Sequence, residues 1–105
     1  MPIYRSGYVS QVDKDELARF YNTAAWKRAR AVVLARSGGL CEFCGEPPKG
    51  GRPLDVVHLA SSTLALLRGA GDPLDVSRMA AGHRTCHAGY SSGNLPGPRR
   101  FEATR

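Results

Sequence analysis

The three cysteines and three histidines of this 105-residue chain constrain its fold more than any other feature. They form three compact groups: Cys41-x-x-Cys44, the single His58, and His83-x-x-Cys86-His87. A two-residue gap lets two side chains reach one ion from a tight turn, and two such turns supply the four ligands of a tetrahedral site. Sulfur and imidazole ligands favour zinc over magnesium or calcium. The sequence therefore predicts a zinc site that joins the middle of the chain to its later part.

The expected ligands are three cysteines and one histidine: Cys41, Cys44, His83 and Cys86. His87 is the alternative to His83, but it directly follows Cys86 and would point about 100° away from it around a helix. Four protein ligands leave no open position for water, so we expect a structural zinc ion. The competing interpretation, two unrelated cysteine turns with stray histidines, accounts less well for the paired spacings.

The length and the cysteine usage narrow the class of protein. A chain of 105 residues is expected to form one domain, and a domain this small gains from a metal or a cross-link because it buries proportionally little surface. Three cysteines cannot all pair with one another, which favours a reducing compartment and a cytoplasmic location. No run approaches the roughly 20 apolar residues of a membrane span, and the first residues do not resemble a signal peptide.

The residue pattern predicts a mixed α+β fold. We expect an irregular arm over residues 1–12, one zinc-stabilised domain over 13–92, and a flexible basic tail over 93–105. Two helices should open the domain. The first is expected to begin with a capping box of Asp13 and Glu16, and the second to run from 24 to about 36 behind a Thr23 cap.

Shorter elements should follow the first cysteine pair. The pattern predicts a strand over 54–59, a short apolar helix over 61–68, a second strand over 79–81 and a helix within 83–90. The loop over 47–53, rich in proline and glycine, separates the cysteine turn from the first strand.

Positive charge is concentrated near the second expected helix. The chain has 15 basic and 9 acidic residues, a net charge of +6, and residues 19–36 contain no acidic residue. Lys27, Arg28 and Arg30 should turn away from the core, where they would attract a phosphate backbone by releasing its counterions. Charge alone fits an ordinary solvated helix face equally well.

Taken in order, several segments resemble the HNH endonuclease family. They are FYNTAAW at 20–26, LARSGGLC at 34–41, Cys44-Gly45, Val57-His58-Leu59, DPLDVS at 72–77, and Cys86-His87. The resemblance, which covers residues 20 to about 90, implies a small ββα-metal fold in which zinc supports two strands and a helix that clamp a phosphodiester. It also implies catalytic roles for His58, as general base, and for His87, as a ligand of a divalent cation such as magnesium or manganese.

Two positions depart from the family pattern. Val57 stands where the family has an aspartate or histidine, and Arg78 stands where it has an asparagine. A valine offers no ligand, and a permanent positive charge would repel the catalytic cation. Asp55 or Asp75 could replace the lost ligand, although a strand-edge charge and a helix cap are their more ordinary roles.

Three functions follow from this sequence. The favoured one is a domain that binds nucleic acid, with double-stranded DNA as the expected partner and with weak or lost cleavage; its contacts would be Lys27, Arg28, Arg30 and Arg78. The first alternative is an active metal-dependent endonuclease or nickase that uses His58. The second is a zinc-stabilised adaptor that binds another protein through leucines at 62–67.

Overall fold

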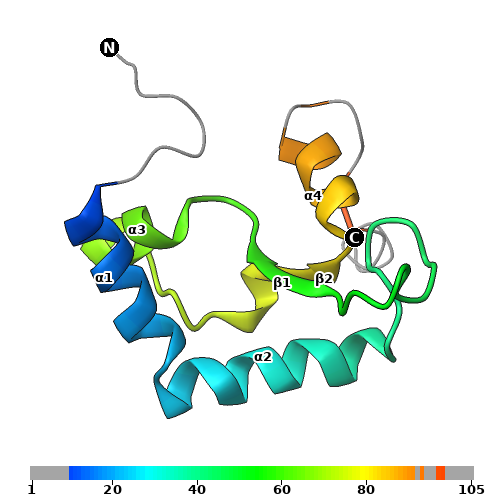
Figure 1. Cartoon of the computed structure of the whole chain (residues 1–105), viewed down its shortest axis with the longest axis horizontal. Helices are drawn as coiled ribbons and strands as arrows, with labels where there is room; N and C mark the ends of the chain where they lie inside the picture. Colours follow the sequence, from blue (N-terminus) through cyan, green and yellow to red (C-terminus); the bar gives the residue numbers. More distant parts are fainter. Residues whose placement is uncertain (1–9, 92, 94–96, 99–105) are drawn as a thin grey trace.

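The chain forms a mixed α+β structure, as the sequence predicted. The computed structural model describes residues 10–91, 93, 97 and 98 (Figure 1). The elements in order are α1 (Gln11–Tyr21), α2 (Ala24–Ser37), β1 (Asp55–His58), α3 (Thr63–Ala65), η1 (Leu66–Ala70), η2 (Val76–Arg78), β2 (Met79–Gly82) and α4 (Arg84–Ser91). Residues 1–9 of the expected arm, and all of the expected tail except 93, 97 and 98, lie outside the described residues. Residues 11 and 12 of that arm already belong to α1.

Helix α1 begins earlier than the sequence predicted. Its N-cap is Ser10, whose hydroxyl accepts a hydrogen bond from the backbone N–H of Asp13. The expected capping box was therefore wrong, because serine is as good a cap as aspartate and stands three residues earlier. The carboxylates of Asp13 and Glu16 instead bind Arg68, at 2.7 and 2.6 Å.

Helix α2 confirms its predicted cap and length. The Thr23 hydroxyl accepts from the Trp26 N–H, and Gly38 ends the helix with a φ of 65°, a left-handed conformation that glycine adopts without strain. The buried face of the helix consists of Trp26, Ala29 and Val33. This face covers the sheet.

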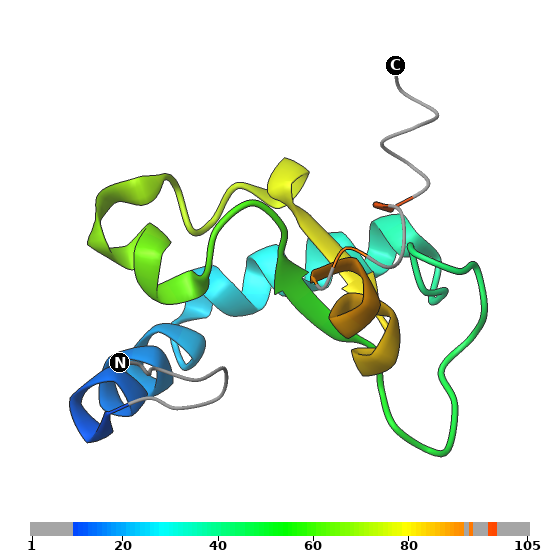
Figure 2. The ribbon, with the colours of Figure 1, turned by 90° about the horizontal axis from the view of Figure 1, so that it is seen from above.

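The sheet consists of two short antiparallel strands. Asp55 pairs with Gly82 at one end of the ladder and His58 with Met79 at the other. Strand β2 is buried along its whole length. Helix α2 lies along one face of the sheet and α4 stands on the opposite side, as Figures 1 and 2 show together. The core therefore sits between α2 and the sheet.

The segment between the strands packs against α1. The helix expected over 61–68 is instead the short α3 followed by the wider turn of η1, which has a kink at Arg68 and Gly69. The Tyr21 hydroxyl lies 2.9 Å from the Thr63 hydroxyl, and Arg68 joins the same two segments through its ion pairs. The three leucines of this segment, at 64, 66 and 67, are half-buried.

Within the described part of the chain, no helix combines the length and the apolar character needed to cross a bilayer.

Candidate metal centre

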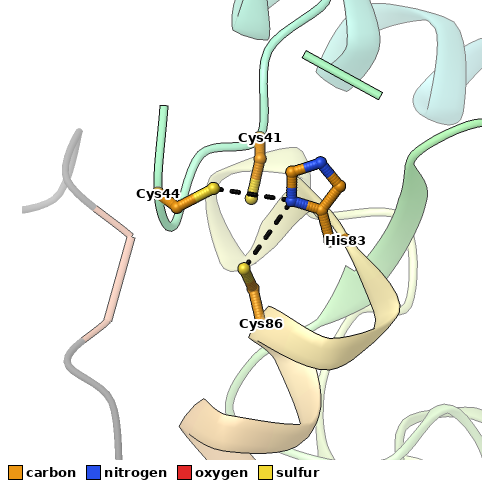
Figure 3. A group of neighbouring side chains, drawn as sticks. All are labelled: Cys41, Cys44, His83 and Cys86. Carbon is orange, nitrogen blue, oxygen red and sulfur yellow. Dashed lines mark hydrogen bonds between the residues drawn. The ribbon is translucent and has the colours of Figure 1, made fainter. Parts of the chain in front are cut away.

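Two turns that are far apart in the sequence bring the four predicted ligands together. Cys41 and Cys44 follow α2, whereas His83 and Cys86 stand at the start of α4, and all four side chains converge (Figure 3). Their ligand atoms all lie within 4.8 Å of one another. The Nδ1 atom of His83 is 3.4 Å from the Cys44 sulfur and 3.7 Å from the Cys86 sulfur. Ligands at bond lengths of about 2.0–2.3 Å around a tetrahedral ion are spaced by about 3.5–3.8 Å. The four residues are therefore close enough to hold one metal ion, and the set is compatible with structural zinc.

Backbone hydrogen bonds fix the first cysteine turn. The N–H of Gly45 donates to the Cys41 carbonyl at 2.8 Å, and Gly45 has a φ of 83°. The N–H of Cys41 donates to the Glu46 carbonyl at 2.8 Å, and that of Glu42 to the Ala81 carbonyl at 2.7 Å. The last bond attaches the turn to β2, so the sheet and the metal centre form one unit.

Phe43 packs between the end of the sheet and α4. It is buried, and its ring lies 5.7 Å from that of Tyr90 and 6.5 Å from that of His87. A Cβ atom added at Gly82 would come within 2.5 Å of the Phe43 ring and within 3.5 Å of the Cys41 sulfur. Gly82 is thus required for close packing at the centre. Sequence reasoning missed this role, because a glycine directly before His83 could equally serve a turn.

His83 is oriented by a backbone carbonyl. Its Nε2 lies 2.8 Å from the carbonyl oxygen of Pro47, which can only accept a hydrogen bond. The Nε2 atom therefore has the proton, and the lone pair of Nδ1 faces the three sulfurs. His87 points elsewhere, with its Nε2 3.3 Å from the Ser91 hydroxyl. The structure thus gathers His83, and not His87, with the cysteines.

The surroundings of the cluster lower the pKa of the Cys41 thiol and raise that of the Cys86 thiol. Burial opposes ionisation of Cys41, but backbone N–H donors from His83, Cys44 and Phe43 outweigh it and lower the pKa to about 7. Burial, together with hydrogen bonds to Cys44 and Cys41, raises the pKa of Cys86 to about 12. The metal-free cluster therefore favours one thiolate at Cys41 over a second at Cys86, and a metal ion has to displace the proton of Cys86.

Arg36 and Glu42 support the metal centre from the side, a role that no sequence pattern indicated. Arg36 stood in the basic segment, yet its guanidinium donates to both carboxylate oxygens of Glu42 and to the carbonyls of Val76 and Met79. Glu42 also accepts from the Ala81 N–H at 2.9 Å. These bonds join the end of α2, the cysteine turn and β2.

His58 has hydrogen-bond partners at both ring nitrogens. Its Nδ1 lies 2.9 Å from the Thr63 hydroxyl and its Nε2 lies 2.8 Å from the Pro73 carbonyl. The carbonyl only accepts, so Nε2 donates and Nδ1 accepts from Thr63. The His58 ring also packs on Trp26, at 5.6 Å between centroids. This arrangement leaves neither nitrogen free to take a proton from water.

The other catalytic candidates lie around His58 without forming a cation site. His58 and His87 border one open groove, in which the half-buried Val57 offers no ligand atom. Arg78 and Asp75 border a separate hollow on another side of His58.

Neither aspartate that could rescue the cation site borders the groove shared by His58 and His87. Asp75 accepts from the N–H and the hydroxyl of Ser77, which lowers the pKa of its carboxyl group, so it serves as a cap. Asp55 lies 4.0 Å from Arg84 at the start of the strand.

The three α2 cations predicted to contact nucleic acid differ in exposure. Lys27 and Arg28 are exposed and Arg30 is half-buried. Among the described residues, these three side chains form no ion pair, in contrast to Arg36 and Arg68. Lys27 and Arg28 therefore lie on the exposed part of α2, whereas Arg30 lies at the edge of its buried face.

No protein-family model, curated protein or solved structure matches this chain. Any function must therefore be argued from the chemistry of the residues themselves.

Proposed function

We propose that this protein is a zinc-stabilised, HNH-like domain that binds nucleic acid and has weak or lost cleavage activity. The proposal has three parts: the identity of the ion, the binding surface and the state of the catalytic centre. Each part has its own support.

The ligand set supports zinc as the ion. Three sulfurs and one imidazole suit zinc, and four protein ligands leave no position for a reactive water molecule. The hydrogen bond from His83 to the Pro47 carbonyl is the type of outer contact that orients a zinc-bound histidine. The ion would therefore stabilise the fold and take no part in catalysis.

The binding surface is supported by the way the fold distributes its cations, and this observation carries the proposal. Arg36 and Arg68 are neutralised by carboxylates within the fold. Lys27, Arg28 and Arg30 have no such partner among the described residues and lie on one helix. Unpaired cations on one helix are suited to contacts with successive phosphates of a nucleic-acid backbone.

Weak or lost cleavage is supported by the surroundings of His58. A general base needs a free nitrogen within hydrogen-bond reach of the attacking water, and both nitrogens of His58 are already engaged. Val57 removes a metal ligand, and Arg78 adds a positive charge beside His58. These features disfavour the divalent cation on which hydrolysis would depend.

The binding part is tested by a salt titration. Fluorescence anisotropy with a short DNA duplex should give an affinity that falls steeply with salt, with a logarithmic slope of about −0.9 for each phosphate neutralised. The Lys27→Gln/Arg28→Gln variant should flatten the slope by about two. A matched control is Lys14→Gln/Arg19→Gln on α1, which removes two exposed cations and should change the slope far less. Undetectable binding at low salt, with zinc bound, would refute the proposal.

An active nuclease is the second candidate, and the groove shared by His58 and His87 is the observation in its favour. Supercoiled plasmid incubated with magnesium or manganese distinguishes the two functions. We expect no nicking above a metal-free control. Nicking that is lost in His58→Ala, with zinc content unchanged, would instead establish the enzyme. The adaptor function has no comparable support, because the leucines at 64, 66 and 67 are half-buried.

A further inference from the structure

A second hollow with basic side chains lies directly beside the metal centre. It is bordered by Lys49 and Arg52 from the loop before β1, by Arg84 from the start of α4, and by the ligands His83 and Cys86. Figure 2 shows this loop extending from the sheet on the same side as α4. No carboxylate is among the described residues that border it. The hollow therefore collects positive charge from two distant segments.

A tight turn holds two of these cations opposite each other. Lys49 and Arg52 form an isolated antiparallel bridge, with the Arg52 N–H donating to the Lys49 carbonyl at 3.1 Å. Gly50 and Gly51 between them have φ values of 62° and 70°, as a tight hairpin turn requires. Like charges placed directly across a strand pair repel each other. The turn thus maintains an unfavourable pair of cations in the absence of an anion.

The surrounding charges offset this repulsion only in part. Arg84 has its Nε 4.0 Å from Asp55, and its side chain is 71% exposed, so solvent screens the pair. Lys49 and Arg52 form no ion pair among the described residues. A zinc ion with three thiolates has a net charge of −1, which would balance one cation at most. An excess of positive charge remains.

We propose that this hollow, formed by Lys49, Arg52 and Arg84, binds a phosphate group. The two guanidinium groups offer paired N–H donors that match phosphate oxygens, and the lysine adds a third charge. The phosphate has two possible sources, a nucleic-acid backbone or a free phosphate ion. Helix α2 lies across the sheet from α4, so the site is separate from the Lys27 and Arg28 surface and its phosphate binding does not depend on that surface.

The experiment titrates sodium phosphate into the zinc-loaded, isotope-labelled chain at constant ionic strength and follows the amide resonances. We expect saturable shifts at Gly50, Gly51 and Thr85, and none with sodium chloride. The Lys49→Gln/Arg52→Gln variant should weaken phosphate binding at least about tenfold, since it removes two charge-assisted contacts. Lys14→Gln/Arg19→Gln again serves as the control and should leave the titration unchanged.

A parallel titration with a DNA duplex distinguishes the two sources. If Lys49→Gln/Arg52→Gln also weakens duplex binding, the site contacts the nucleic-acid backbone; if the duplex affinity is unchanged, the site takes free phosphate. Phosphate shifts that persist unchanged in this variant would overturn the proposal. The proposal would also be overturned if the Lys49→Gln/Arg52→Gln variant no longer bound zinc but still showed the phosphate shifts. Lys49 and Arg52 would then serve only to balance the charge of the thiolates.

Discussion

The guanidinium group of Arg36 lies against both carboxylate oxygens of Glu42, with nitrogen–oxygen distances of 2.9 and 3.0 Å. The same group reaches the carbonyls of Val76 and Met79, at 2.8 and 2.9 Å. Because Glu42 belongs to the first cysteine turn and Met79 opens β2, one side chain joins three parts of the fold. The basic segment at 19–36 therefore contains cations with two different roles.

Replacement of Arg36 should lower the stability of the protein and leave its expected binding to DNA unchanged. Arg36→Ala removes two hydrogen bonds to the mostly buried carboxylate of Glu42 and one to each of the carbonyls of Val76 and Met79, which should lower the free energy of unfolding by about 2 kcal/mol. Urea denaturation with zinc present measures this. Arg28→Ala on the same helix is the control and should change stability by less than about 0.5 kcal/mol while weakening DNA binding. Equal losses of stability in the two variants would contradict these separate roles.

Zinc binding should require His83 and tolerate the loss of His87. His83→Ala removes one of four ligands and is expected to abolish stoichiometric zinc binding, because the remaining three sulfurs leave the coordination open. His87→Ala is the matched control, since it changes a histidine four residues later that lies outside the cluster. Metal analysis of the purified chains should find one zinc ion per molecule in the control only. The opposite result would reassign the ligand.

A methyl group at Gly82 should disturb both packing and metal affinity. Gly82→Ala places its Cβ 2.5 Å from the Phe43 ring, so the ring or the strand has to move at a cost of about 1–3 kcal/mol. Thermal unfolding and competition with a chromophoric chelator measure the two effects. At Gly97 an added Cβ meets only an ordinary contact of 3.6 Å with Tyr90, so Gly97→Ala should behave like the original chain. An unchanged melting temperature in Gly82→Ala would show that Phe43 is not held as described.

Zinc affinity should fall as the pH is lowered. The thiol of Cys86, whose pKa is about 12, is protonated in the metal-free fold throughout the range from pH 6 to 8. That of Cys41, whose pKa is about 7, becomes protonated only as the pH falls below 7. Zinc therefore displaces at least one proton above pH 7 and two below it, so its affinity should drop at least about tenfold per unit from pH 8 to 7 and more steeply from 7 to 6. Chelator competition at several pH values measures this, and a flat profile would contradict the assigned thiols.

Local signals predicted α2 and the tight turn between Cys41 and Cys44 well. Thr23 specifies the start of α2 through its hydroxyl and Gly38 specifies the end through its left-handed backbone, and the spacing of Cys41 and Cys44 depends only on a tight turn. Both features are encoded within a few residues. For that reason they can be predicted from sequence without any tertiary contact.

The sequence patterns did not predict contacts between distant segments. The carboxylates of Asp13 and Glu16 resembled a capping box, but Arg68, more than 50 residues away, binds them. The second hydrogen bond of His58 goes to the carbonyl of Pro73, a group that every residue possesses and that no pattern can mark. Side-chain periodicity predicts single helices and strands. It does not predict which loop carbonyl will accept a hydrogen bond from a distant side chain.

The hydrogen bond between His83 Nε2 and the Pro47 carbonyl has a thermodynamic consequence. It connects a metal ligand to the loop that bears Lys49 and Arg52, so occupancy of one site would bias the geometry of the other. Linkage then requires reciprocity: if zinc strengthens phosphate binding by some factor, phosphate strengthens zinc binding by the same factor. Through the Pro47 carbonyl, the affinity for zinc and the affinity for phosphate would therefore depend on each other.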